Sequence, residues 1–133
     1  MSAVAIERVL TQWTAEVLGR TVDTDICRGG IPAGKKNFVS VMLGGEIPDS
    51  RIGPRTWNLQ ILGRFVSRDD ALEMLDRLAG AVPFYDLETG GVRIVSLVPR
   101  GGGEPYPAGG NGALGWNASA NFEVSALLTN PDR

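Results

Sequence analysis

The sequence predicts an α+β fold, with a four- to five-stranded, mostly antiparallel sheet and two helices packed on one face. Residues 55–82 carry apolar side chains first at every second position and then at steps of three and four. This pattern predicts a strand that leads directly into an amphipathic helix. A second helical stripe occupies 3–18, and a clean apolar–polar alternation occupies 117–128. Most connections are too short to hold a crossover helix, which favours antiparallel neighbours.

The first helix is expected over 3–18. Ser2 can cap its start, because a serine hydroxyl accepts from first-turn amides. Gly19 can end it, because glycine tolerates a left-handed conformation. The apolar positions recur at steps of three and four: Ile6, Val9, Leu10, Trp13 and Val17.

Two strands and two loops are expected between this helix and the central strand. The apolar alternation at 38–43 predicts a strand, whereas 22–28 is a weaker candidate because aspartates interrupt it. The segments 29–37 and 44–54 are rich in glycine and proline, which predicts loops.

The central strand has one apolar face and then stops at Ser67. The apolar residues on that face are Trp57, Leu59, Ile61 and Phe65. The Ser67 hydroxyl can accept from the amide of Asp70, so a helix is expected over 68–79. Gly80 can take a left-handed C-terminal conformation, and Pro83 prevents continuation.

The C-terminal third is expected to hold two strands. Residues 84–91 form a connection, 92–98 a strand, 99–115 a long loop and 117–128 the last strand. We find no internal repeat and no domain linker, so 1–133 is interpreted as a single α+β domain.

Composition excludes several classes of protein. A net charge of −2 does not suit a molecule that binds polyanions over its whole surface. A single cysteine excludes an intramolecular disulfide and fits a reducing compartment. No apolar run reaches the ~18 residues of a membrane span, and the N-terminus does not resemble a signal peptide. We therefore expect no membrane association, and assembly from a bacterial cytoplasm.

The chain has no histidine, which removes the commonest general base and the usual zinc ligand. Residues 29–36 (GGIPAGKK) fit most of a phosphate-binding loop, but Lys36 replaces the magnesium-binding hydroxyl and a strand follows instead of a helix. We interpret the segment as a surface turn with two solvated lysines, Lys35 and Lys36. The acidic residues lack the spacing of a calcium loop. No catalytic residue, cofactor or metal is therefore predicted.

The segment after Arg100 is the feature that a plain core does not explain. Loops longer than ~12–15 residues are usually functional or disordered, and glycine makes ordering costly. Contact with a partner would offset that cost, with Tyr106 and Trp116 as expected anchors. A merely mobile loop remains the alternative.

Six positions around the central unit carry a resemblance to a known family: Asn58, Gln60, Arg64, Ser67, Ala71 and Leu78. Together with the preceding VSVMLGGE and the closing NASANFEVSALL, they resemble the small tail-terminator proteins of long-tailed bacteriophages, also described as tail-completion or minor capsid proteins. The resemblance implies a structural virion protein without an active site. It implies a homo-oligomeric ring, typically of six subunits, that caps the tail tube and joins tail to head.

The resemblance also implies partners: the major tail tube protein, a head–tail connector or stopper protein, and DNA only as it passes through the ring. We expect the ring contact to use the loop 44–54 with Arg51 and Ile52, and the loop 101–115 with Tyr106. Trp116, Lys35 and Lys36 are further candidates. Three other functions stay open: a connector or stopper (neck) protein, a small-molecule or peptide-binding domain, and an enzyme without histidine.

Overall fold

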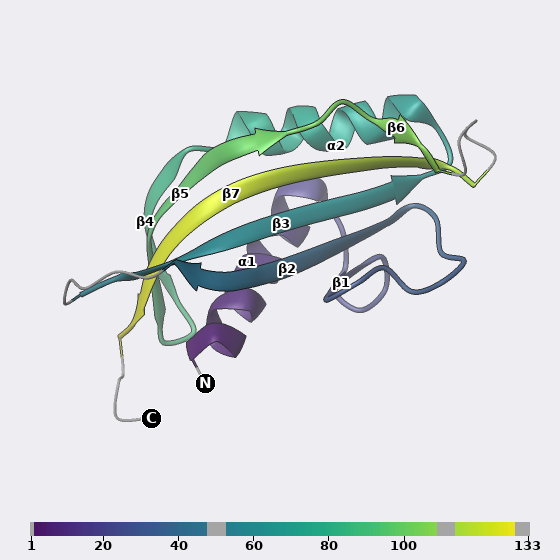
Figure 1. The fold of residues 1–133 in the computed structure, drawn as a ribbon. Helices are drawn as coiled ribbons and strands as arrows, with labels where there is room; N and C mark the ends of the chain where they lie inside the picture. The colour runs from purple at the N-terminus through teal and green to yellow at the C-terminus, as the bar shows by residue number, and fades with distance from the viewer. Residues whose placement is uncertain (1, 48–52, 109–113, 130–133) are drawn as a thin grey trace.

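The computed structural model describes residues 2–47, 53–108 and 114–129 (Figure 1). Within these residues the chain forms two helices and seven strands. The strands make up one mixed sheet that curls into a half-barrel. The elements are α1 (Ser2–Leu18), β1 (Ile26–Arg28), β2 (Phe38–Ile47), β3 (Arg55–Phe65), α2 (Arg68–Ala81), β4 (Phe84–Thr89), β5 (Val92–Gly102), β6 (Tyr106–Pro107) and β7 (Trp116–Leu128).

The strands lie in the order β1-β2-β3-β7-β5-β4, and the short β6 pairs with β7 where β5 has left it. β1 runs parallel to β2, whereas the other pairs are antiparallel. The longest ladder joins β3 to β7, from Arg55 opposite Ala126 to Phe65 opposite Trp116. These two strands form the centre of the sheet (Figure 1).

The predicted fold class, a four- to five-stranded mostly antiparallel sheet with two helices on one face, is wrong. The segment 84–91, expected to be a connection, forms β4 and the turn into β5. The register shifts between Leu43 and Glu46, between Ile94 and Ser96, and between Pro99 and Gly102. Such bulges bend and twist a strand, which explains why the sheet curls around the helices.

The sequence predicted which single residues cap or end the helices, and the structure tests these predictions. Gly19 ends α1 with φ 67°, and the amide of Arg20 donates to the carbonyl of Ala15 at 2.8 Å, as in a Schellman motif. Ser67 caps α2 as predicted, since its Oγ accepts from the amide of Asp70 at 3.1 Å. The prediction that Gly80 ends α2 is wrong, because the helix continues through Ala81.

The core lies between the two helices and the inner face of the sheet. α1 and α2 contact each other; α1 also contacts β1, β2, β5 and β7, and α2 contacts β3 and β7. The large side chains that are fully buried come from both layers: Ile6, Leu10, Ile26, Val39, Val41, Leu59, Ile61, Leu78, Val92, Ile94, Leu97 and Val124. Gly63 lets α2 approach, because a methyl group there would lie 2.6 Å from Met74 Sδ.

Candidate interaction surfaces

Three segments lie together at the end of the sheet where β3 stops, on the right of Figure 1: the end of β3 with Val66, the end of the loop 29–37, and the start of β7. Hydrogen bonds hold them together. The amide of Val66, after β3, donates to Asn37 Oδ1 in the loop 29–37 at 3.3 Å. Arg64 Nε donates to Asn117 Oδ1 at the start of β7 at 3.0 Å. This end of the molecule is therefore a defined surface built from segments far apart in sequence.

Two large apolar side chains are exposed here. Val66 is 60% exposed and Leu114 is 61% exposed. They lie just beyond the last pair of the β3–β7 ladder, Phe65 opposite Trp116, and Gly115 packs against the carbonyl of Phe65. We call Val66 and Leu114 the apolar tip. Both residues therefore lie at the same end of the sheet, where the β3–β7 ladder stops.

Basic residues occur in the segments that meet at this end of the sheet. Lys35 and Lys36 lie in the loop that bonds to Val66, Arg64 lies on β3, and Arg68 is the first residue of α2. We call these four residues with the apolar tip the basic end. Asp69 and Asp70, in the first turn of α2, lie beside it. The segments at this end of the sheet therefore carry two exposed apolar residues and more basic than acidic residues.

The structure places the residues that the sequence analysis singled out in different surroundings. Lys35 and Lys36 are exposed in the basic end. Tyr106 lies on β6, opposite Asn117, and is 49% exposed. Trp116 is half-buried and packs against the core. Arg51 and Ile52 fall outside the described residues.

The expected loop 99–115 is partly regular. β5 continues through Gly102. The backbone of Gly102 lies so close to β7 that a methyl group on its Cα would be 3.0 Å from the carbonyl oxygen of Ser119. The amide of Gly103 then donates to the same carbonyl at 3.2 Å, and β6 pairs with β7. The sequence did not reveal these pairings because glycine and proline mask a strand pattern.

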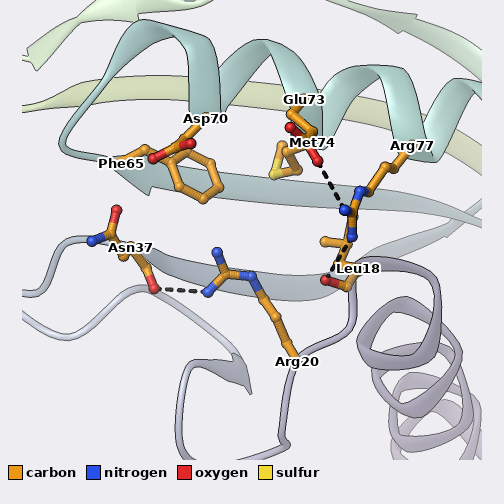
Figure 2. A pocket seen from close by; sticks show the side chains of 8 residues that line it. All are labelled: Leu18, Arg20, Asn37, Phe65, Asp70, Glu73, Met74 and Arg77. Carbon is orange, nitrogen blue, oxygen red and sulfur yellow. Dashed lines mark hydrogen bonds and ion pairs between the residues drawn. The ribbon is translucent and has the colours of Figure 1, made fainter.

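A pocket of about 270 Å³ opens between the end of α1 and the α2 residues from Asp70 to Arg77 (Figure 2). Leu18, Phe65 and Met74 give it apolar walls. Two arginines point into it from opposite sides, Arg20 and Arg77. The pocket therefore brings together charged groups from α2 (Asp70, Glu73 and Arg77) and from the segment after α1 (Arg20).

Both arginines are already bonded to the protein. Arg20 Nη1 donates to the carbonyl of Asn37 at 2.8 Å, and its guanidinium lies 5.4 Å from the centre of the Phe65 ring. Arg77 pairs with Glu73 at 2.8 Å and donates to the carbonyl of Leu18 at 3.3 Å. These bonds tie the end of α1, the loop 29–37 and α2 together, which indicates a structural role for the pocket.

The thiol of Cys27 is not activated as a nucleophile. Burial raises the pKa of the Cys27 thiol, and the charge of Asp23 raises it further. The thiol therefore stays protonated at neutral pH, whereas the thiolate is the reactive form. Across the described ranges, no cluster of three or more metal-ligating side chains occurs. In that part of the chain, no helix is long and apolar enough to cross a membrane.

A second surface lies where α1 runs beside the β4–β5 hairpin, toward the other end of the molecule (Figure 1). It is a groove of about 490 Å³ between Ala5, Val9 and Trp13 on α1 and Leu87 and Gly90 on the hairpin. We call it the α1–β4 groove. The ring of Trp13 also contacts the ring of Phe84, with centroids 5.1 Å apart and planes tilted by 32°. Sequence reasoning missed the groove because it took β4 as a connection.

Glu7 fixes α1 to the edge of the sheet. Its carboxylate accepts from Arg28 Nε on β1 and from the amide of Leu43 on β2, both at 2.8 Å. The Glu7 side chain is only 18% exposed. The contact satisfies a strand amide that β1 does not reach, so α1 has a fixed position against β2 and the groove has a rigid wall.

Comparison with known proteins supports the architecture. No family model matches the chain, and no curated protein matches its sequence. Its structure is similar to that of a chain from the virion of a native gene transfer agent (GTA) particle, with a TM-score of 0.52 and 16% sequence identity. The match covers 93% of this chain and 91% of that chain. At this identity the likeness shows a shared fold.

Proposed function

We propose that this protein is a structural component of a phage-like particle. The observation that carries the proposal is the likeness of fold, over nearly the whole of both chains, to a chain of the gene transfer agent virion. A domain with exposed apolar and basic groups at one end and an apolar groove elsewhere suits assembly with other protein chains. We propose no catalytic activity, since the chain lacks histidine and the Cys27 thiol stays protonated.

Within that class, we propose a tail terminator: a ring, with six subunits as the expected number, that caps the tail tube and joins tail to head. The sequence resemblance supports this role. Asn58 and Gln60, two of its positions, lie on β3 between buried Trp57, Leu59 and Ile61, so they face away from the core. The outward face of β3 is therefore polar at these two positions.

The proposed partners follow from this role. One repeated heterologous contact would close the ring, and the two flat faces of the ring would meet the tube protein and the head–tail connector. DNA would pass through without specific binding. The protein would then reside in the neck of the virion after assembly in the host cytoplasm. Arg51, Ile52, Tyr106, Trp116, Lys35 and Lys36 remain the proposed contact residues.

Deletion of the gene tests the proposal. We expect particles to lack joined tails and to accumulate tubes of irregular length, because no ring would stop tube growth. Electron microscopy of the particles measures both effects, and a plasmid copy of the gene should restore normal tails. Tails of defined length, joined normally to heads in the deletion strain, would contradict the terminator role. Deletion of a gene for an unrelated particle protein serves as the control.

A further inference from the structure

We infer that Arg64 binds a carboxylate group of a neighbouring protein chain, with Tyr106 as a second contact in the same row of the sheet. This inference rests on the proposed place in a phage-like particle and names one group that a partner in the particle would present. The ion pairs of the sheet, the burial of Arg64 and the strand register around it carry the argument.

Arg64 differs from the other arginines of the sheet in its partner. Its Nε donates to the neutral Oδ1 of Asn117 at 3.0 Å, and this is its one polar contact within the described residues. The other arginines on the described strands each pair with a carboxylate of the chain: Arg28 with Glu7, Arg55 with Glu46, Arg93 with Asp86 and Arg100 with Glu123. In the part of the chain that the structure describes, the charge of Arg64 therefore has no opposite charge bonded to it.

Burial makes a missing carboxylate matter more at Arg64 than elsewhere on the sheet. Arg64 is half-buried, whereas the other strand arginines are exposed. Its stem lies against the backbone just before β7, since a methyl group at Gly115 would be 3.6 Å from Arg64 Cγ. A guanidinium that is partly withdrawn from water loses hydration, and a paired carboxylate compensates for that loss. A carboxylate from another chain would supply this compensation.

The strand register surrounds Arg64 with uncharged side chains. Arg64 lies opposite Phe38 on β2 and opposite Asn117 on β7, and Tyr106 lies opposite Asn117 on the other side of β7. Opposite residues of antiparallel strands share a face, so these four side chains form one row across the sheet. The next row holds Ser40, Leu62 and Ser119. Neither row contains an acidic residue, and Glu104, the nearest one in sequence, makes no bond to Arg64.

The geometry of this row suits a carboxylate. Asn117 is 9% exposed and binds Nε, so the guanidinium is oriented before any partner arrives. The two Nη groups make no hydrogen bond within the described residues, and two N–H donors in one plane match the two oxygens of a carboxylate. Tyr106 is 49% exposed and presents a hydroxyl that can donate a further hydrogen bond to the partner. We call Arg64 and Tyr106 the carboxylate site.

A protein carboxylate fits the carboxylate site better than a nucleic acid phosphate. Nucleic acids are held by several cations that follow their backbone, whereas Arg64 is the single cation of its row and the net charge of the chain is −2. Farther along β3 and β7 the row of Gln60 opposite Asn121 is again polar and uncharged, which suits the rim of a protein interface. Arginine and tyrosine also dominate the energetics of such interfaces. The partner is therefore expected to present an aspartate or glutamate side chain.

Arg64→Gln and Arg100→Gln form a matched pair of variants, because each removes one strand arginine. We expect Arg64→Gln to lower the yield of complete particles about tenfold or more, since the partner carboxylate loses its bidentate donor. Arg100→Gln breaks a pair inside the chain and should leave assembly normal. Electron microscopy counts the particles, and thermal melts of the purified variants check their folding. Normal assembly with Arg64→Gln, an equal defect in both variants, or a melting temperature far lower for Arg64→Gln than for Arg100→Gln overturns the inference.

A photo-crosslinking amino acid at Tyr106 identifies the partner group. In producing cells and in particles, we expect crosslinks to another protein chain, on a peptide that contains an aspartate or glutamate. Changing that acidic residue to arginine should abolish the crosslink, and combining the change with Arg64→Glu should restore it, because the two charges are exchanged. A probe at exposed Asp76, on α2, is the control and should not give this product. Crosslinks only to DNA, no product, or no recovery after the charge exchange overturns the inference.

The outcomes separate this inference from the proposed function. If the deletion strain lacks joined tails but particles with Arg64→Gln are normal, the protein is a terminator whose contacts do not use Arg64. If the charge exchange restores the crosslink but the deletion strain makes normal tails, the carboxylate site stands and the terminator role fails.

Discussion

The β3–β7 ladder and the edge strand β4 differ in how much of each strand the protein itself covers. Along β3 and β7, side chains alternate between the buried core and a polar outer face, and each strand has a neighbour on both sides. Along β4 only Phe84 and Leu87 are half-buried, and the remaining residues are exposed. The centre of the sheet stabilises the fold, whereas the edge and the ends leave surfaces for contact with other molecules.

The two regions also handle backbone hydrogen bonds differently. In the central ladder, the backbone amides and carbonyls of β3 and β7 pair with each other. At the edges the protein uses other means: Glu7 accepts from the amide of Leu43 on β2, and Asp86 takes a left-handed conformation on β4. Such features discourage unwanted strand pairing between copies. Contacts with partners should therefore involve side chains more than strand edges.

The largest effect is expected in the layer that covers the central ladder. Leu78 on α2 is 1% exposed within the core. Leu78→Ala should lower the free energy of unfolding by about 2–5 kcal/mol, because it removes buried methyl groups and leaves a cavity. Denaturant melts measure the loss. Leu114→Ala, at an exposed position, is the control and should change stability little; equal losses for both would show that α2 is not docked on the sheet.

A smaller loss is expected for Gly63→Ala. A methyl group at Gly63 would lie 2.5 Å from Phe65 Cε2 and 2.6 Å from Met74 Sδ, so α2 or the Phe65 ring must shift. Overpacking of this kind costs about 1–3 kcal/mol. Gly45→Ala is the matched control, since nothing lies within 4 Å of the added group. Thermal melts that show the same stability for both variants would mean that the helix–sheet contact is looser than described.

The contrast between the centre and the edge of the sheet explains which elements could be predicted from the sequence. The central strand, the cap at Ser67 and the end of α1 at Gly19 depend on local patterns, and the sequence predicted them. The sequence did not predict β4, because an edge strand with Asp86 and Glu88 lacks the apolar–polar alternation of a half-buried strand. Gly44 and Gly45 indicated a loop, yet β2 continues through them with a bulge.

The interaction surfaces were harder to predict than the strands. Lys35, Lys36 and Tyr106 could be proposed from residue type alone. The apolar tip depends on the pairing of β3 with β7, which brings Val66 and Leu114 to the same end of the sheet. The α1–β4 groove depends on packing between α1 and a hairpin far along the chain. Contacts between distant segments leave no local pattern, so a single sequence does not reveal them.

The contact at Glu7 ranks next in expected effect. Glu7→Ala would leave the amide of Leu43 without this acceptor and would remove the partner of Arg28. We expect a loss of about 1–2 kcal/mol, at the lower end for a charged hydrogen bond because the site is partly exposed. The control is Glu46→Ala, which breaks the more exposed pair between Glu46 on β2 and Arg55 on β3. Equal stability of the two variants in urea melts would contradict a special role for Glu7.

The smallest effect is expected at the sheet edge. Arg93 Nε lies 2.8 Å from Asp86 Oδ1, but their side chains are 47% and 65% exposed. Water screens such a pair, and holding both side chains costs entropy, so Arg93→Ala should change the free energy of unfolding by less than about 1 kcal/mol. Adding salt should reduce even this difference. Urea melts at low and high salt measure it; a loss as large as that of Leu78→Ala would mean that the edge is held as firmly as the centre, and the contrast between the two regions would fail.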